Sequence, residues 1–241
     1  MGNVRQSKRN KNIILEKNQY NYFGRKICHR LSNSKLKLIN EILPKIKITK
    51  DFLKKNRNKK NFTKKDIILE VGFGMGDNLK HMISNNKNSI FIGCEPYLNG
   101  IANFLSKIND NDYERVKIFD EDARILLNTL PDDFFSNIIL LFPDPWKKRR
   151  HKKRRLLNEL NINIFLRTLK KNGKIYFGTD VENYFSEVRN ILLEKKIYII
   201  ENEKNFYSLP KMLCETKYAK KSIKKGIIPK YLVVKKNVDI L

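Results

Sequence analysis

The chain has 241 residues, 41% of them hydrophobic, which is enough to bury one sizeable core. Its 51 Lys and Arg outnumber 25 Asp and Glu, and the formal net charge of +26 favours a polyanionic partner over a membrane surface. The longest apolar run, 138–142, is far too short for a membrane span, and the N-terminus lacks the apolar segment of a secretory signal, so we expect a cytoplasmic protein.

The three Cys and three His are scattered, so neither a disulfide framework nor a metal site is expected. Abundant lysine alone could be a compositional bias. Arginine is sparse elsewhere and clusters at four positions, which are Arg149, Arg150, Arg154 and Arg155. This clustering favours a nucleic acid or another acidic substrate.

In chain order, residues 1–60 are predicted to form a basic N-terminal arm with one short helix before Pro44, and 61–241 the main domain. In that domain short apolar runs alternate with helical segments. Strands are expected at 66–71, 89–95, 116–120, 136–142 and 173–180, with 197–200 and 231–234 completing the sheet. We therefore predict a doubly wound, Rossmann-like α/β sheet of about seven mostly parallel strands, which binds ligands at the carboxyl ends of its strands.

Three glycines follow the first predicted strand in a G-x-G-x-G spacing, at Gly72, Gly74 and Gly76. Glycine at such a turn lets a ligand approach the backbone closely. The spacing differs from the G-x-G-x-x-G of dinucleotide-binding proteins, and no Lys-Ser/Thr of a P-loop follows it. Glu70 precedes the first glycine and suits a cationic ligand better than a pyrophosphate.

Two further carboxylates follow the next two predicted strands. Glu95 could accept both hydroxyls of a ribose, and Asp122, followed by Ala123, could accept the exocyclic amine of an adenine. Together with Glu70 they match the arrangement of class I S-adenosylmethionine methyltransferases. Helix capping would explain any one of these acids, but it is a poor explanation for all three.

The fourth predicted strand ends in FPDPWKKRRHKKRR at 142–155. Pro143 and Pro145 restrict the backbone around Asp144, so this carboxylate and the neighbouring Trp146 are expected at the mouth of a cleft. The basic residues that follow suit phosphate groups. A basic run is often only a solvated surface, but its fusion to a rigid acidic and aromatic loop favours a functional site.

These motifs resemble the bacterial tRNA (guanine-N7)-methyltransferase family over nearly the whole chain. The resemblance also rests on Thr179-Asp180 and on Gly24-Arg25-Lys26 followed by Leu31-Ser32. It implies that 61–241 is a methyltransferase domain that binds S-adenosylmethionine through Glu70, Gly72, Gly74, Gly76, Glu95, Asp122 and Ala123. It also implies Asp144 at the reacting centre and tRNA contacts from Lys148, Asp180, Thr216, Lys217 and Tyr218. The family target is guanine 46 in the variable loop of tRNA.

One position departs from the family pattern T-[KR]-[FY]-E, because this chain has Ala219 where Glu is usual. Either another acid such as Glu215 takes over, or one substrate contact is missing. By the same resemblance we expect neither a metal nor an obligate protein partner. Both a monomer and a homodimer remain open.

Guanine N7 carries no proton, so its methylation needs no strong general base. Catalysis is expected from alignment of N7 with the methyl carbon and sulfur, and from a carboxylate where positive charge develops, the role assigned to Asp144. Asp180 could hold the hydrogens on N1 and N2 of guanine. Trp146 either stacks on the base or anchors the loop. The phosphate backbone is assigned to Lys148, Arg149, Arg150, Arg154 and Arg155.

Three other functions stay open. An amino-directed nucleic-acid methyltransferase typically carries [ND]-P-P-[YFW] after the fourth strand, whereas this chain places Asp between the prolines. A non-catalytic RNA-binding protein on this fold would be expected to lose the donor-binding acids, yet all three are present. An NAD-dependent dehydrogenase is disfavoured by the glycine spacing.

Overall fold

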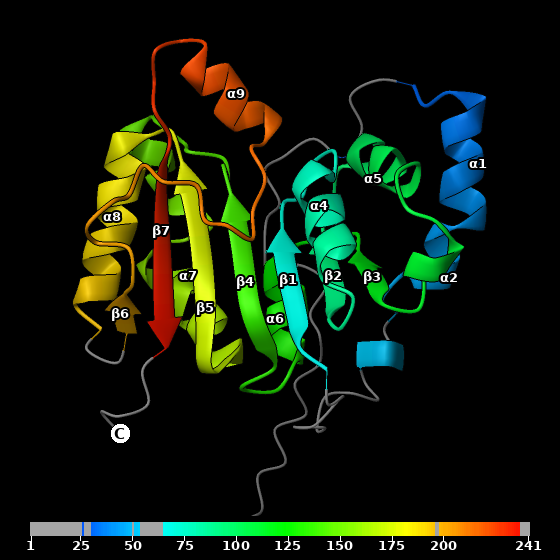
Figure 1. Ribbon diagram of the computed structural model, residues 1–241, viewed down its shortest axis with the longest axis horizontal. Helices are drawn as coiled ribbons and strands as arrows, with labels where there is room; N and C mark the ends of the chain where they lie inside the picture. Colours follow the sequence, from blue (N-terminus) through cyan, green and yellow to red (C-terminus); the bar gives the residue numbers. More distant parts are fainter. Residues whose placement is uncertain (1–25, 27–29, 50, 54–64, 196–197, 237–241) are drawn as a thin grey trace, which may run out of the picture.

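The computed structural model describes residues 26, 30–49, 51–53, 65–195 and 198–236. Seven strands form one sheet in the order β3-β2-β1-β4-β5-β7-β6 (Figure 1). Strands β1 to β5 pair in parallel, and β7 runs antiparallel between β5 and β6. Their bounds are β1 Ile67–Val71, β2 Ile90–Cys94, β3 Val116–Phe119, β4 Phe135–Leu141, β5 Leu169–Thr179, β6 Tyr198–Ile200 and β7 Lys230–Lys236. The predicted doubly wound sheet of about seven mostly parallel strands is confirmed.

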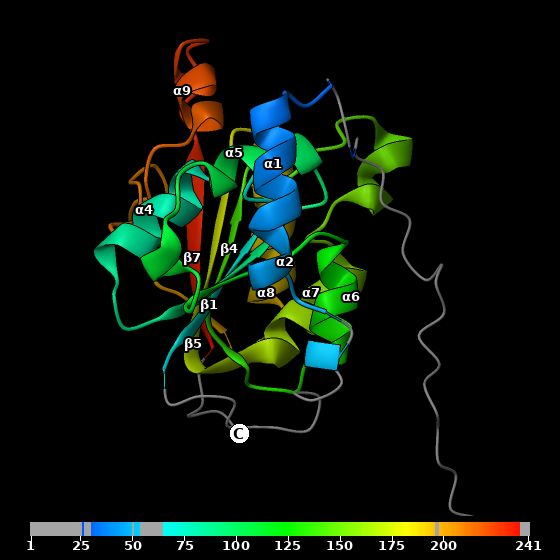
Figure 2. The ribbon, with the colours of Figure 1, turned by 90° about the vertical axis from the view of Figure 1, so that its right-hand side faces the viewer.

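Helices cover both faces of the sheet, which is why β1 is buried at every position. Leu69 of β1 faces a core built with α6, α7 and α8, and the adjacent Ile68 faces a second core built with α2, α4 and α5 (Figure 2). The α-helices are α1 Asn33–Glu41, α2 Leu43–Ile46, α4 Asp77–Asn85, α5 Leu98–Leu105, α6 Ala123–Thr129, α7 Glu159–Thr168, α8 Glu182–Leu193 and α9 Lys217–Ile223. The 3-10 helices are η1 Asp110–Asp112 and η2 Arg149–Arg154. None of the helices in the described ranges is long and apolar enough to cross a membrane.

The N-terminal segment joins the core well before the predicted boundary at residue 60. Leu43, Ile46 and Ile48 are all buried. The backbone N–H of Ile48 donates to the carbonyl of Ile118 at 2.7 Å, and Lys47 bridges to Ile118, so this segment covers the exposed edge of β3. Apolar residues of the supposed arm are therefore part of the packed domain. Gly24 and Arg25, part of the predicted family segment, lie outside the described residues.

Helix α9 lies beyond the carboxyl ends of the parallel strands, at the top of Figure 1. It was not predicted from the sequence. Its two buried residues, Ala219 and Ser222, are small and leave no apolar periodicity to detect.

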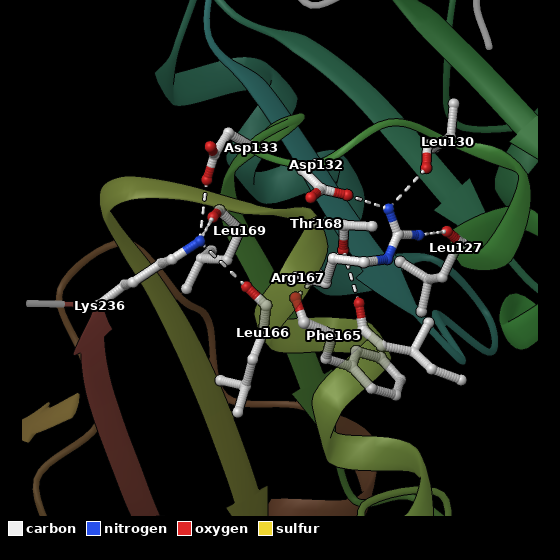
Figure 3. Close-up of polar contacts among 11 residues, drawn as sticks. Leu127, Leu130, Asp132, Asp133, Phe165, Leu166, Arg167, Thr168, Leu169 and Lys236 are labelled. Carbon is white, nitrogen blue, oxygen red and sulfur yellow. Dashed lines mark hydrogen bonds and ion pairs between the residues drawn. The ribbon is translucent and has the colours of Figure 1, made fainter. Parts of the chain in front are cut away.

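At the opposite end of the sheet two cations bind helix C-termini (Figure 3). Arg167 donates to the carbonyls of Leu127 and Leu130 at the end of α6, at 2.6 and 3.0 Å. Lys236 donates to the carbonyls of Leu166 and Leu169 at the end of α7, at 3.3 and 2.7 Å. Each cation binds backbone carbonyls at a helix end, where its positive charge complements the helix dipole.

Candidate active site

The glycine loop between β1 and α4 has a left-handed backbone at all three predicted positions, with φ of 71° at Gly72, 54° at Gly74 and 76° at Gly76. Side chains are strained there, which explains the glycines. A Cβ on Gly72 or Gly74 would meet no atom within 4 Å, so both border open space. A Cβ on Gly76 would lie 2.5 Å from Phe104, so this glycine also permits close packing of the loop on α5.

Glu70, at the end of β1, is 3% exposed, and burial raises its pKa from 4.5 to about 8. Asn78 opposes this rise, and the charges of Glu95 and Asp77 add to it. Among the described residues Glu70 Oε2 and Asn78 Nδ2 make no regular hydrogen bond, although both atoms are buried. Apart from the interaction with each other that lowers the Glu70 pKa, this buried acceptor and this buried donor make no regular hydrogen bond, and such unsatisfied polar atoms are typical of a site for a polar ligand.

Asn78 was not singled out by sequence reasoning. Its Oδ1 accepts a hydrogen bond of 2.9 Å from the backbone N–H of Cys214. This bond orients the amide and ties the first turn of α4 to the segment that leads into α9. The available signal was a polar residue just after the last glycine, on the helix face that carries the buried Leu79, Met82 and Ile83.

Glu95 follows β2 and is 6% exposed. Its Oε2 accepts from the backbone N–H of Gly74 at 2.8 Å, and its Oε1 accepts from that of Tyr97 at 2.9 Å. Burial raises the pKa of Glu95, those two N–H groups lower it, and the charge of Asp144 raises it. Glu95 thus holds the glycine loop in place, and each carboxylate oxygen keeps a further lone pair for a ligand.

Asp122 caps the N-terminus of α6, as the helix-capping alternative supposed. Its Oδ1 accepts from the backbone N–H of Arg124 at 2.8 Å and from Nε at 2.9 Å, and its Oδ2 accepts from Nη2 at 2.7 Å. Ala123 is buried in the first turn of α6. Both oxygens of Asp122 are therefore engaged by its own helix, and its contact with an adenine stays a prediction.

The loop after β4 is held in a tight shape. Phe142 and Trp146 have positive φ angles of 52° and 43°, which are costly for bulky residues and require support from the surroundings. The backbone N–H of Phe142 donates to the carbonyl of Gly178 at 2.7 Å. Between these two residues, Asp144 is exposed to solvent, and its charge reaches Glu95. Because β4 pairs in parallel with β1, this loop and the glycine loop begin at the same edge of the sheet.

Helix α9 closes one side of this region. The ring of Tyr218 stacks on Phe142 with centroids 6.3 Å apart, and burial together with the charges of Glu95 and Asp144 raises the pKa of its hydroxyl. Thr216 caps the helix by accepting from the backbone N–H of Ala219 at 3.2 Å. Lys217 is exposed at its first position. The predicted residues 216–218 are thus brought to the site.

Asp180 follows β5 and accepts a hydrogen bond of 2.7 Å from Ser222 Oγ, which fastens α9 to the sheet. Sequence reasoning missed Ser222. Ala219 faces inward on the same helix and is completely buried.

The basic segment 147–155 divides into three kinds of residue. Lys148, Arg149 and Arg150 are exposed. The guanidinium carbon of Arg154 lies 5.0 Å from the ring centroid of Trp146, so the guanidinium covers one face of the indole. Arg155, predicted to contact the tRNA backbone, has a side chain that is only 1% exposed and bonded inside the protein.

His151 packs its edge against Trp146, with ring centroids 5.8 Å apart. Desolvation and the neighbouring cations Arg154, Arg150 and Lys148 lower its pKa, which shows how strongly positive this surface is. Within the described ranges no group of three or more His, Cys, Asp or Glu is placed to hold a metal ion.

Comparison with known proteins gives a family. The family described as "Putative methyltransferase" matches residues 64–228. A "Bifunctional methyltransferase" of Rickettsia felis is 34% identical over 88% of this chain, which spans only 39% of that relative. A "tRNA (guanine-N(7)-)-methyltransferase" of Bartonella henselae is 33% identical over 88% of this chain and 93% of its own length.

Among solved structures, one described as "Structure of an Antibiotic Related Methyltransferase" aligns with a TM-score of 0.50 at 19% identity, covering 79% of this chain and 95% of that one. This likeness shows a common fold. The family match and the relative from Bartonella henselae lead to one conclusion: the chain belongs to the bacterial tRNA (guanine-N7)-methyltransferase family.

Proposed function

We propose that this protein transfers a methyl group from S-adenosylmethionine to N7 of a guanine in tRNA, with guanine 46 of the variable loop as the expected target. One observation supports the proposal above all. Strands β1 and β4 are parallel neighbours, so the loop that carries the exposed Asp144 begins at the same edge of the sheet as the glycine loop. An acidic loop for an acceptor therefore adjoins the buried polar groups Glu70 and Glu95 for a donor. The name of the Bartonella henselae relative supports the same activity.

The residues near the glycine loop fit the amino-acid end of S-adenosylmethionine. The unpartnered Oε2 of Glu70 would accept hydrogens from its ammonium, and the unpartnered Nδ2 of Asn78 would donate to its carboxylate. The open space beside Gly72 and Gly74 leaves room for a ligand against the backbone. When bound, S-adenosylmethionine supplies a methyl group on a positively charged sulfur.

The nucleoside end would lie toward the ends of β2 and β3. Glu95 would accept the ribose hydroxyls with its remaining lone pairs, while its bonds to Gly74 and Tyr97 keep the carboxylate fixed. Asp122 would accept the adenine amine, with Ala123 beside it. Because Arg124 already engages both oxygens of Asp122, we expect this contact to be weaker than the ribose contact.

For the acceptor, we assign electrostatic and positioning roles. Asp144 would stabilise the positive charge that develops on the guanine ring as N7 is methylated. Asp180 would accept the N1 and N2 hydrogens, and its bond from Ser222 would fix its orientation. Tyr218, stacked on Phe142, would limit how the base enters and so align N7 with the methyl carbon.

The exposed Lys148, Arg149 and Arg150 would hold the phosphate backbone, and the exposed Lys217 at the start of α9 would also contact the tRNA. Arg154 stacks on Trp146, so we assign Trp146 to anchoring the loop on that face. We further propose that the protein acts in the cytoplasm without a metal or an obligate protein partner.

The test is to incubate the purified protein with unmodified tRNA and methyl-labelled S-adenosylmethionine, digest the tRNA and identify the labelled nucleoside. We expect 7-methylguanosine, and strongly reduced label with Asp144→Asn. Label in 6-methyladenosine would instead indicate an amino-directed enzyme. Absence of label, with tRNA binding intact, would indicate a non-catalytic RNA-binding protein.

A further inference from the structure

Arg155 is the last residue of the basic run, yet it is among the most completely buried large side chains of the described chain. A buried charge requires partners, and this one has them on three sides. Its Nε donates to the carbonyl of Pro145 at 2.8 Å, and its Nη1 donates to Asn183 Oδ1 at 3.1 Å and to Glu187 Oε2 at 2.6 Å.

The flat face of the guanidinium is used as well. Its central carbon lies 4.6 Å from the ring centroid of Tyr184, a residue of α8 that is fully buried. The Tyr184 hydroxyl in turn accepts from the backbone N–H of Leu157 at 3.0 Å. Arg155 therefore connects the loop after β4 to the first two turns of α8. The Tyr184 ring that its guanidinium covers is itself held in place by the hydrogen bond from Leu157.

The bonded carbonyl has a specific place in the loop. Pro145 directly follows Asp144 and directly precedes Trp146, and the loop has costly backbone angles at both Phe142 and Trp146. Such a conformation persists only where the surroundings determine it. The hydrogen bond to the Gly178 carbonyl fixes the start of the loop at Phe142, and the bond from Arg155 fixes its end.

We propose that Arg155 is a positioning residue that sets the loop conformation in which Asp144 faces the acceptor, and that it does not bind tRNA. This inference rests on the proposed function for its catalytic consequence. A guanidinium is required because its rigid fork donates in separate directions while its face covers an aromatic ring. A lysine keeps the charge but cannot make the same set of contacts.

The single tryptophan of the chain provides a direct probe, since Trp146 adjoins the bonded carbonyl. In Arg155→Lys we expect the Trp146 emission to shift and its quenching by acrylamide to increase, without tRNA or S-adenosylmethionine present. We expect kcat to fall about 100-fold, as for a catalytic group displaced by roughly 1 Å, with tRNA affinity close to that of the wild type.

Arg167→Lys is the matched control, because Arg167 also bonds backbone carbonyls but lies at the opposite end of the sheet (Figure 3). It should lower the melting temperature while leaving Trp146 emission and kcat unchanged. Glu187→Gln is a second variant that keeps the guanidinium and weakens one of its partners. Its effects on emission and kcat should have the same direction as those of Arg155→Lys and be smaller.

Wild-type emission and kcat in Arg155→Lys would overturn the proposal. So would a loss of tRNA affinity with unchanged kcat, since that would make Arg155 a tRNA contact. Equal changes in Arg167→Lys would reduce the effect to general destabilisation and overturn the proposal too. If the wild-type protein transfers no methyl group, the proposed function fails separately, and the emission of Trp146 still decides whether Arg155 holds the loop.

Discussion

Replacing Glu70 by glutamine tests the physical account of the donor pocket without relying on any enzymatic assay. The carboxyl group is buried and its pKa is about 8, against 4.5 for an ordinary glutamate. Because the folded protein binds this proton more tightly than the unfolded chain does, Glu70 adds most stability below about pH 4.5. That contribution is lost as the pH rises through about 8. The glutamine side chain of the variant has the same shape and no proton to lose.

The size of the effect follows from the shift in pKa. Between pH 5 and pH 9 the wild type should lose about 4 kcal/mol of unfolding free energy relative to Glu70→Gln. For a chain of this size that corresponds to a change in melting temperature on the order of 10 °C. Water entering the pocket would reduce this value, so it is an upper figure.

The assay is thermal unfolding without donor at pH 5, 7 and 9 for the wild type, Glu70→Gln and Glu114→Gln. Glu114 is an exposed glutamate and controls for the loss of a negative charge. The melting temperature of Glu70→Gln minus that of the wild type should grow with pH, whereas the difference for Glu114→Gln should stay flat. A difference for Glu70→Gln that does not change with pH would refute the reasoning.

Adding S-adenosylmethionine extends the same experiment. A cation next to Glu70 favours its ionised form, so the ligand should raise the melting temperature of the wild type more than that of Glu70→Gln. The gap should be wider at pH 7 than at pH 5, because Glu70 is then easier to ionise while the ammonium of the ligand still carries its proton. Equal ligand-induced shifts in the two proteins would mean that the ammonium does not reach Glu70.

Three further outcomes are expected. Asp144→Asn should nearly abolish turnover in single-turnover assays while tRNA affinity in filter binding stays near normal, and full turnover would remove Asp144 from the mechanism. Asn78→Ala should weaken S-adenosylmethionine binding about 10-fold in calorimetry by loss of one charge-assisted hydrogen bond, whereas Cys214→Ala should not, because Cys214 bonds Asn78 through its backbone. Arg150→Ala should weaken tRNA binding and reduce by about 1 the steepness with which the logarithm of the binding constant falls with the logarithm of salt concentration. An unchanged slope would exclude a phosphate contact by Arg150.

The sheet could be predicted from the sequence because buried parallel strands are short continuous apolar runs. β1 and β2 begin and end within one residue of the predicted ranges. β5 begins at Leu169 instead of residue 173, because Leu169 pairs with Phe135 before the chain passes through the left-handed Asn172. That pairing depends on a partner strand more than 30 residues away, and local pattern cannot reveal it.

The positions of the candidate site residues in the fold could be predicted from the sequence, and their contacts only in part. The acids of the strand ends are where the sequence placed them, but the capping of α6 by Asp122 and its pairing with Arg124 depend on local geometry. The burial of Arg155 depends on Asn183 and Glu187 of α8, so nothing in the basic run distinguishes it from its exposed neighbours. A run of charged residues predicts an exposed surface. Contacts with residues distant in the sequence determine which of those charged side chains are buried instead.

The N-terminal segment shows the same dependence on tertiary partners. The sequence predicts one short helix before Pro44, but it does not reveal that Leu43 and Ile46 are buried or that Lys47 pairs with Ile118 at the edge of β3. Within the described residues, 30–49 therefore pack with the main domain although they precede the predicted boundary at residue 60.

The central claim is methyl transfer to one guanine of tRNA, and one comparison tests it most directly. Two transcripts of the same tRNA, one natural in sequence and one with guanine 46 replaced by adenine, are each incubated with the protein and methyl-labelled S-adenosylmethionine. The labelled nucleoside is then quantified in each. The account predicts 7-methylguanosine from the first transcript and background from the second. Equal label in both transcripts, or label in any nucleoside other than 7-methylguanosine, would contradict it.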